Sequence, residues 1–158
     1  MELKSSLSVF NEAEIPAGQG IVSGQIRKRL AGNADHPSER ILAILATFKP
    51  GTLEPLHWHV VEAFHYVISG RAVVRDIEGH AHEVGPGSVI YAPPGITGSH
   101  EWEVQEELQL LAIRATTDVE RSLQITVDPS TRESRIELKQ LAADLIVGGA
   151  VNFKQSLY

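Results

Sequence analysis

The stretch GTLEPLHWHVVEAFHYVISG, residues 51–70, decides how this chain is expected to fold and where its chemistry should lie. His57 and His59 are separated by one residue. Successive side chains of a β-strand point to opposite faces, so both imidazoles project to the same side. At roughly 6.6 Å between their Cα atoms, two imidazoles can converge on one metal ion if a third ligand approaches from elsewhere. The pair therefore predicts a strand that forms one wall of a metal site.

Short apolar runs alternate with turn residues on both sides of this stretch. Residues 41–48, ILAILATF, end at Lys49-Pro50-Gly51 and predict a strand buried on both faces, although a short buried helix would have a similar composition. Further runs are separated by Gly and Pro at the spacing of about 8 to 12 residues that is typical of a sandwich or barrel. These runs are 64–70, 71–79, 80–87, 88–95, 99–105 and 108–116. The pattern predicts an all-β core.

The two ends of the chain read differently from the core. Residues 1–20 end in Pro and Gly and are expected to form an arm against the body or against a second subunit. Residues 119–128 can add an edge strand, and residues 134–146 have the one-sided apolar spacing of a helix. We therefore expect a single domain over residues 1–158, with its core at about 41–116 and a C-terminal helix and tail at about 134–158.

Composition limits the classes of function. The 158 residues include 14 basic and 20 acidic side chains, a net charge of −6, which disfavours nucleic acid and anionic membranes as partners. Cysteine is absent, so a metal must be held by imidazole or carboxylate. No apolar run reaches the length of a signal peptide or a membrane span, and no helix-turn-helix pattern is present. We expect a soluble, cytoplasmic protein that binds a small molecule.

A third histidine, His100, follows the Pro- and Gly-rich turn at 93–98. With it, the chain resembles the cupin superfamily, whose first motif reads G(X)5HXH(X)3-4E(X)6G and whose second reads G(X)5PXG(X)2H(X)3N. The matching positions are Gly51, His57, His59, Gly70, Gly87, Pro93 and Gly95. The resemblance implies a double-stranded β-helix, that is, a small RmlC-like jelly-roll barrel. It also implies metal ligation by the paired histidines together with His100.

The sequence departs from the first motif at the glutamate, because that position is Ala63. Glu62 lies one residue earlier and faces away from the barrel if the strand is regular, so metal ligation by it would need a bulge. Ala63 and His65 then face inward, which makes His65 the candidate catalytic acid–base residue or a fourth metal ligand. A pocket histidine held by hydrogen bonds is the competing interpretation of His65.

The second motif is also altered. Four residues, 96–99, replace the usual two before His100, and Val104 stands at the asparagine position. A longer turn can still deliver His100 to the site, or can leave it as a loop histidine packed near Trp102. His80 and His82 share the spacing of a metal pair, but they adjoin a hairpin turn and are expected at the surface.

Three imidazoles without a carboxylate form a neutral ligand set for one divalent transition metal. With Fe(II), our first expectation, the resemblance implies a dioxygenase-type oxidoreductase that acts on a small organic substrate. With Zn, Ni or Mn, the alternative is a Lewis-acid isomerase, lyase or cyclase in which His65 moves the proton. A non-catalytic small-ligand sensor or storage cupin is the remaining alternative. Cupins that this chain resembles are commonly dimers, so we expect a homodimer.

Overall fold

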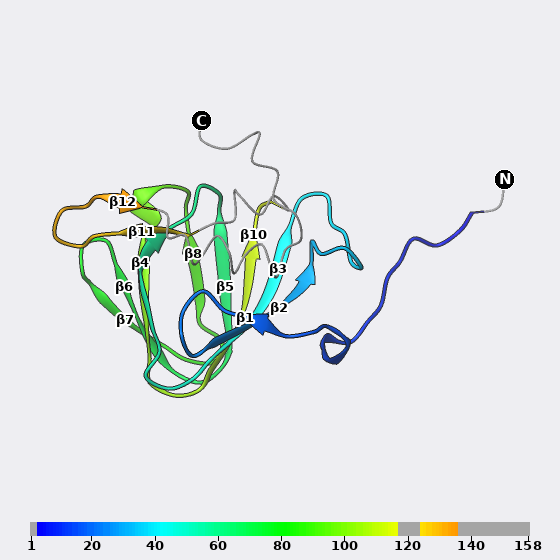
Figure 1. Ribbon diagram of the computed structural model, residues 1–158, viewed down its shortest axis with the longest axis horizontal. Coiled ribbons are helices and arrows are strands. Elements are labelled where there is room, and N and C mark those ends of the chain that lie inside the picture. The colour runs from blue at the N-terminus through cyan, green and yellow to red at the C-terminus, as the bar shows by residue number, and fades with distance from the viewer. Residues whose placement is uncertain (1–2, 117–123, 136–158) are drawn as a thin grey trace.

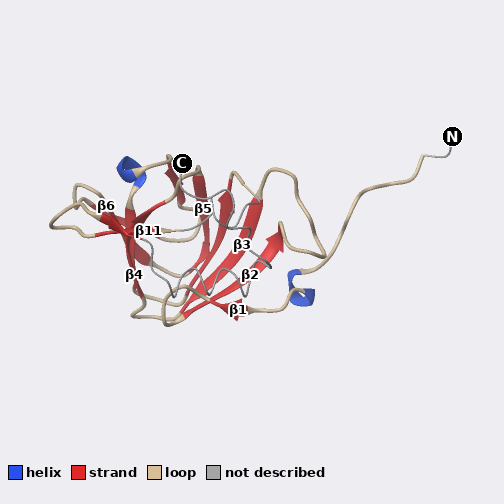
Figure 2. Ribbon diagram, turned by 45° about the horizontal axis from the view of Figure 1, so that its top comes forward, coloured by secondary structure: helices blue, strands red, loops and turns tan. Residues whose placement is uncertain are grey.

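The computed structural model describes residues 3–116 and 124–135, and nearly all of their regular structure is β-strand (Figure 1, Figure 2). Two short 3-10 helices are η1 (Glu12–Glu14) and η2 (Ile96–Gly98). The strands are β1 (Gly18–Gln19), β2 (Gln25–Ala31), β3 (Leu42–Phe48), β4 (Leu53–Trp58), β5 (Ala63–Ser69), β6 (Ala72–Asp76), β7 (Ala81–Val84), β8 (Val89–Ala92), β9 (His100–Val104), β10 (Leu108–Arg114), β11 (Ile125–Val127) and β12 (Ser134–Arg135).

The strands form two antiparallel sheets that face each other across a common core (Figure 1). The first sheet has the order β1-β2-β3-β10-β5-β8, and the second has the order β12-β11-β4-β9-β6-β7. From β3 to β10 the chain passes repeatedly between the sheets, with β3, β5, β8 and β10 in the first and β4, β6, β7 and β9 in the second. This arrangement confirms the predicted all-β jelly-roll barrel.

The core lies between the sheets and is built from side chains of both. Phe48 and Leu108 come from the first sheet, whereas Trp102 and Val104 come from the second, and all four are at most 2% exposed. The predicted strand at 41–48 is present as β3, but the prediction that it is buried on both faces is wrong. Its burial alternates, because only one face of the first sheet packs on the second sheet.

The chain ends depart from the sequence prediction in two places. Of the predicted edge strand at 119–128, residues 119–123 lie outside the described residues and the described part forms β11, which lies between β4 and β12 rather than at the sheet edge. The predicted helix at 134–146 is wrong at its first two residues, which form β12; the rest of it, with the tail, lies outside the described residues. At the other end, residues 3–10 have no regular secondary structure and extend away from the barrel (Figure 1).

None of the helices within the described residues is long and apolar enough to cross a membrane.

Candidate metal centre

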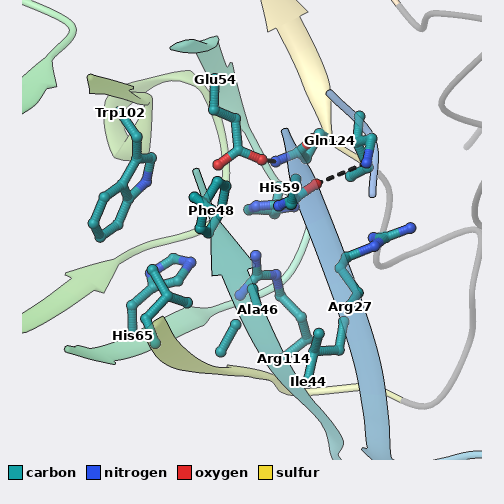
Figure 3. Close-up of a pocket in the computed structure, with 14 residues that line it drawn as sticks. Arg27, Ile44, Ala46, Phe48, Glu54, His59, His65, Trp102, Arg114 and Gln124 are labelled. Carbon is teal, nitrogen blue, oxygen red and sulfur yellow. Dashed lines mark hydrogen bonds between the residues drawn. The ribbon is translucent and has the colours of Figure 1, made fainter. Parts of the chain in front are cut away.

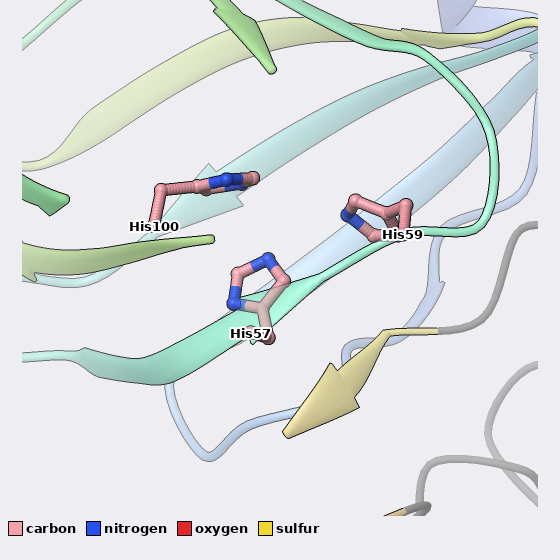
Figure 4. A group of neighbouring side chains, drawn as sticks. All are labelled: His57, His59 and His100. Atoms are coloured by element: carbon pink, nitrogen blue, oxygen red, sulfur yellow. The ribbon is translucent and has the colours of Figure 1, made fainter. Parts of the chain in front are cut away.

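His57, His59 and His100 lie together inside the barrel, and their rings point toward one another (Figure 4). One ligand nitrogen from each lies within 4.8 Å of the others, and all three side chains are buried. His57 belongs to β4, His59 follows that strand immediately, and His100 begins β9. The shared orientation of His57 and His59 follows the alternation expected from their one-residue spacing.

The backbone holds these three residues in place before any ligand arrives. His57 and His100 are direct partners in the antiparallel ladder between β4 and β9. The turn after β8 joins His59 to His100, because the Gly95 N–H donates to the His59 carbonyl at 2.9 Å and the Gly98 carbonyl accepts from His100 Nδ1 at 2.9 Å. The longer turn before His100 therefore forms η2 and delivers the histidine to the site.

Two of the imidazoles are set in a defined tautomer by backbone carbonyls. His57 Nδ1 lies 2.7 Å from the Pro55 carbonyl, and His100 Nδ1 contacts the Gly98 carbonyl, so each Nδ1 carries a proton and donates it. The Nε2 atoms of His57 and His100 are then unprotonated and carry a lone pair. A hydrogen bond from Nδ1 to a backbone carbonyl is a common way in which proteins orient metal-ligating histidines.

The donors fit a transition metal. His100 Nε2 is buried and has no hydrogen-bond partner within the described part of the chain, although a buried acceptor is normally satisfied. A metal ion bound by the three imidazoles would use this lone pair. Imidazole nitrogen suits Fe, Zn and Ni, and the absence of cysteine is consistent with a nitrogen ligand set.

Burial keeps the histidines neutral. Desolvation lowers the pKa of His57 to about 4 and that of His100 to about 3, and it lowers the pKa of His59 and His65 well below the ordinary value of 6.5. The positive charge of Arg114 acts in the same direction on all four. At neutral pH the imidazoles are therefore unprotonated at one ring nitrogen each, as metal binding requires.

His65 lies on the opposite wall of the cavity, on β5 of the first sheet. It is buried, and its ring centroid is 5.2 Å from that of His100 and 5.5 Å from that of Trp102. It does not join the 4.8 Å group of ligand atoms. Its Nδ1 has no hydrogen-bond partner among residues 3–116 and 124–135. His65 is thus placed to exchange a proton with a molecule inside the cavity.

The other candidates lie outside the cavity. Glu62 is exposed and accepts a hydrogen bond from the Tyr91 hydroxyl at 2.7 Å, whereas the neighbouring Ala63 faces inward. His80 and His82 are exposed, as expected, and both contact the carboxylate of Asp76. The strand β5 therefore keeps regular alternation, and no bulge turns Glu62 toward the histidines.

Sequence reasoning missed Glu54 and Gln124. Gln124 Nε2 donates to the buried Glu54 carboxylate (Figure 3). The same nitrogen lies 3.0 Å from His57 Nε2, so Gln124 connects the two residues. Strict alternation would put Glu54 and His57 on opposite faces, but the register of β4 shifts between them. Pro55, which lacks a ladder N–H, was the available signal for a bulge at this point.

Arginine side chains line the same cavity, which sequence reasoning also missed. Arg27 on β2 and Arg114 on β10 are both buried and contribute to its wall together with Glu54, His59 and His65. The Arg114 guanidinium lies toward the centre of the cavity, between His65 and His59 (Figure 3). The cavity thus combines neutral imidazoles with fixed positive charge.

Comparison with known proteins agrees with this architecture. The family model of the cupin domain matches residues 44–114. Among curated proteins no sequence matches the chain. The polyketide cyclase RemF from Streptomyces resistomycificus superposes with a TM-score of 0.60 at 19% identity, covering 68% of this chain and 78% of that one.

Two further solved structures are similar. KdgF from Halomonas sp. has a TM-score of 0.57 at 23% identity, covering 68% of this chain and 94% of its own. An RmlC-like cupin from Shewanella frigidimarina has a TM-score of 0.57 at 18% identity, covering 73% of this chain and 94% of its own. At these identities the likeness supports the fold.

Proposed function

Because this chain is a member of the cupin superfamily, we propose that it is a metal-dependent enzyme that acts on a small organic substrate at the centre formed by His57, His59 and His100. One observation carries the proposal: the buried Nε2 of His100, whose tautomer the Gly98 carbonyl fixes, lies within the histidine cluster and has no hydrogen-bond partner among the described residues. Such an arrangement is costly to bury unless it binds something, because buried acceptors lose their hydrogen bonds to water.

The first reaction class that we propose is dioxygenase-type oxidoreduction with Fe(II), and Zn, Ni or Mn are the alternative metals. When bound, a divalent metal supplies a Lewis acid to a substrate oxygen and, if it is Fe(II), a centre that reacts with dioxygen. The residues of the chain set the charge and the solvent access of this centre. The three imidazoles are neutral and leave the positive charge of the ion uncompensated, and the barrel walls restrict the access of water.

The position of His65 favours a second candidate, a Lewis-acid isomerase, lyase or cyclase. A neutral imidazole whose Nδ1 has no hydrogen-bond partner within the described residues can accept a proton from a substrate carbon and return it elsewhere. The buried Glu54 carboxylate, hydrogen-bonded to Gln124, is a further proton acceptor on the cavity wall.

Elemental analysis of untagged protein, purified without chelator under anaerobic conditions, tests the proposal. We expect about one equivalent of a transition metal per chain, since three histidines form one site. Iron would favour oxygen chemistry, and another metal would favour Lewis-acid chemistry. His65→Ala should retain the metal, because His65 lies outside the group of ligand atoms. Loss of metal in this variant would instead make His65 a ligand.

A chain that binds no metal even after reconstitution would contradict the enzyme proposal. The ligand-binding sensor or storage interpretation would then account better for the cavity.

We also propose that the chain is a homodimer. Exposed apolar side chains gather on the outer face of the first sheet, where Tyr66 on β5 pairs in register with Val89 on β8 and Phe64 pairs with Tyr91. Val89 and Tyr91 are each 57% exposed. A two-fold interface would bury this face against its own copy. The cytoplasmic location stays a prediction.

Light scattering coupled to size-exclusion chromatography is expected to report twice the chain mass of 17.3 kDa. Replacing Tyr66 and Val89 together with glutamate should shift the mass toward the monomer, because the substitutions place charges within the apolar face. His82→Glu, an exposed position on the second sheet, is the matched control and should leave the dimer intact. A wild-type mass near 17.3 kDa at micromolar concentration would contradict the dimer.

A further inference from the structure

The position that carries glutamate in the first cupin motif is Ala63 in this chain, and it has a specific neighbour. In the ladder between β5 and β10, Ala63 is the direct partner of Arg114. Both face the cavity side of the first sheet, with Ala63 fully buried and Arg114 only 7% exposed. A buried arginine therefore stands beside the place where the motif would put a carboxylate.

Small side chains leave room around this arginine. Ala112 lies two residues before Arg114 on the same face of β10, and Ala46 lies on the neighbouring strand β3. Both line the cavity with the Arg114 guanidinium, and Figure 3 shows Ala46 beside it. A glutamate at position 63 would fill part of this space and pair with the guanidinium. With alanine there, the space next to the guanidinium can accept a group of similar size from a ligand.

The charges of the cavity wall favour an anion. Among the described lining residues, Arg27 and Arg114 are positive, Glu54 is negative and the histidines are neutral, which gives 2 − 1 = +1. A divalent metal on the three histidines would raise this to about +3. The charge of Arg114 reaches all four cavity histidines, since it lowers the pKa of each. In an interior of low dielectric, such a charge attracts a carboxylate strongly.

We propose that Arg114 forms a carboxylate-binding subsite and that the substrate is a small organic acid whose carboxylate lies where the motif glutamate would be. Arginine suits this role because its planar guanidinium binds a carboxylate through two parallel hydrogen bonds. The reactive part of the acid then lies between His65 and the three metal-site histidines. The substrate class rests on the proposed function, whereas the subsite itself depends only on Arg114 and Ala63.

Calorimetric titration with malonate and with malonamide tests the subsite. The two probes have nearly the same shape, but only malonate is charged. Metal-free and Zn-loaded protein should both bind malonate more tightly than malonamide. Arg114→Gln should weaken malonate binding by about tenfold to a hundredfold, since the charge-assisted hydrogen bonds between guanidinium and carboxylate are lost. Arg114→Lys should bind malonate more tightly than Arg114→Gln does, because lysine keeps the positive charge but lacks the two parallel N–H donors of the guanidinium.

A second pair of variants keeps the test valid if the arginine variants do not fold. Ala63→Glu restores the motif carboxylate, and Ala63→Gln is its uncharged control of the same size. Ala63→Glu should weaken malonate binding at least about tenfold more than Ala63→Gln does, because the new carboxylate competes for the guanidinium. Equal losses in the two variants would indicate a steric effect and overturn the subsite.

The two proposals fail separately. Equal affinity for malonate and malonamide in Zn-loaded protein, or an unchanged malonate affinity in Arg114→Gln, would overturn the subsite and leave the metal centre in place. Absence of metal binding together with Arg114-dependent binding of malonate to metal-free protein would overturn the enzyme proposal and retain the subsite.

Discussion

Replacing His57 with alanine is expected to lower the affinity for a divalent transition metal by about a hundredfold or more. In the proposed centre His57 is one of three nitrogen ligands, and even the loss of a residue that only orients a ligand commonly costs about tenfold to a hundredfold in metal affinity. The residue also connects the centre to its surroundings, through Nδ1 to the Pro55 carbonyl and through Nε2 to Gln124. Its loss therefore removes a ligand and loosens the remaining two.

Competition with a chromophoric chelator measures this affinity for Zn without any substrate. His80→Ala is the matched control, because it makes the same chemical change on the exposed hairpin between β6 and β7 and should leave the Zn affinity unchanged. If His57→Ala and His80→Ala bound Zn equally well, the three-histidine centre would be the wrong site.

Metal-free protein is expected to lose stability steeply as the pH falls below 6.5. Burial lowers the pKa of His57 to about 4 and of His100 to about 3, and lowers that of His59 and His65 well below the ordinary value. Near pH 5, His57 and His100 are neutral in the folded chain and protonated in the unfolded chain, so unfolding takes up nearly two protons at these two residues, which corresponds to about 2.5 kcal/mol per pH unit. The lowered pKa values of His59 and His65 act in the same direction.

The sign follows from the direction of the shifts. Because each folded pKa lies below the unfolded value, the contribution is fully present above pH 6.5 and is lost as the pH falls toward 4. His57 alone accounts for about 3 kcal/mol over this window. Urea unfolding at pH 7.5, 6 and 5 measures the slope. His57→Gln should reduce it by about one proton, and His82→Gln, an exposed control, should not change it.

An unchanged slope in His57→Gln would contradict the buried neutral imidazole at this position.

The barrel and the three histidines were predictable because both depend on short, regular patterns. Two histidines spaced one residue apart on a strand must share a face, and His65 keeps the parity of a regular β5. The position of His100 was harder, since four turn residues stand where the motif has two. Only the structure shows that three of these residues form η2 and that the Gly98 carbonyl at its end orients the His100 ring.

The supporting residues were not predictable, for two physical reasons. Glu54 faces the cavity only because a register shift in β4 breaks the alternation that sequence reasoning assumes. Arg114 and Gln124 come from segments more than ten residues from any predicted site residue, and strand pairing brings them to the cavity. A single sequence contains no direct record of which distant strands pair.

The division of the cavity between the two sheets has a consequence for how such a protein can diverge. All three metal-site histidines belong to or directly follow strands of the second sheet, whereas His65, Arg27 and Arg114 belong to the first. Substitutions on the wall of the first sheet can therefore change which molecule the cavity accepts without altering the three histidines on the other wall. On the proposed function, substrate preference can thus diverge while the metal centre is kept, and Ala63 beside Arg114 is the position where we expect such a change in this chain.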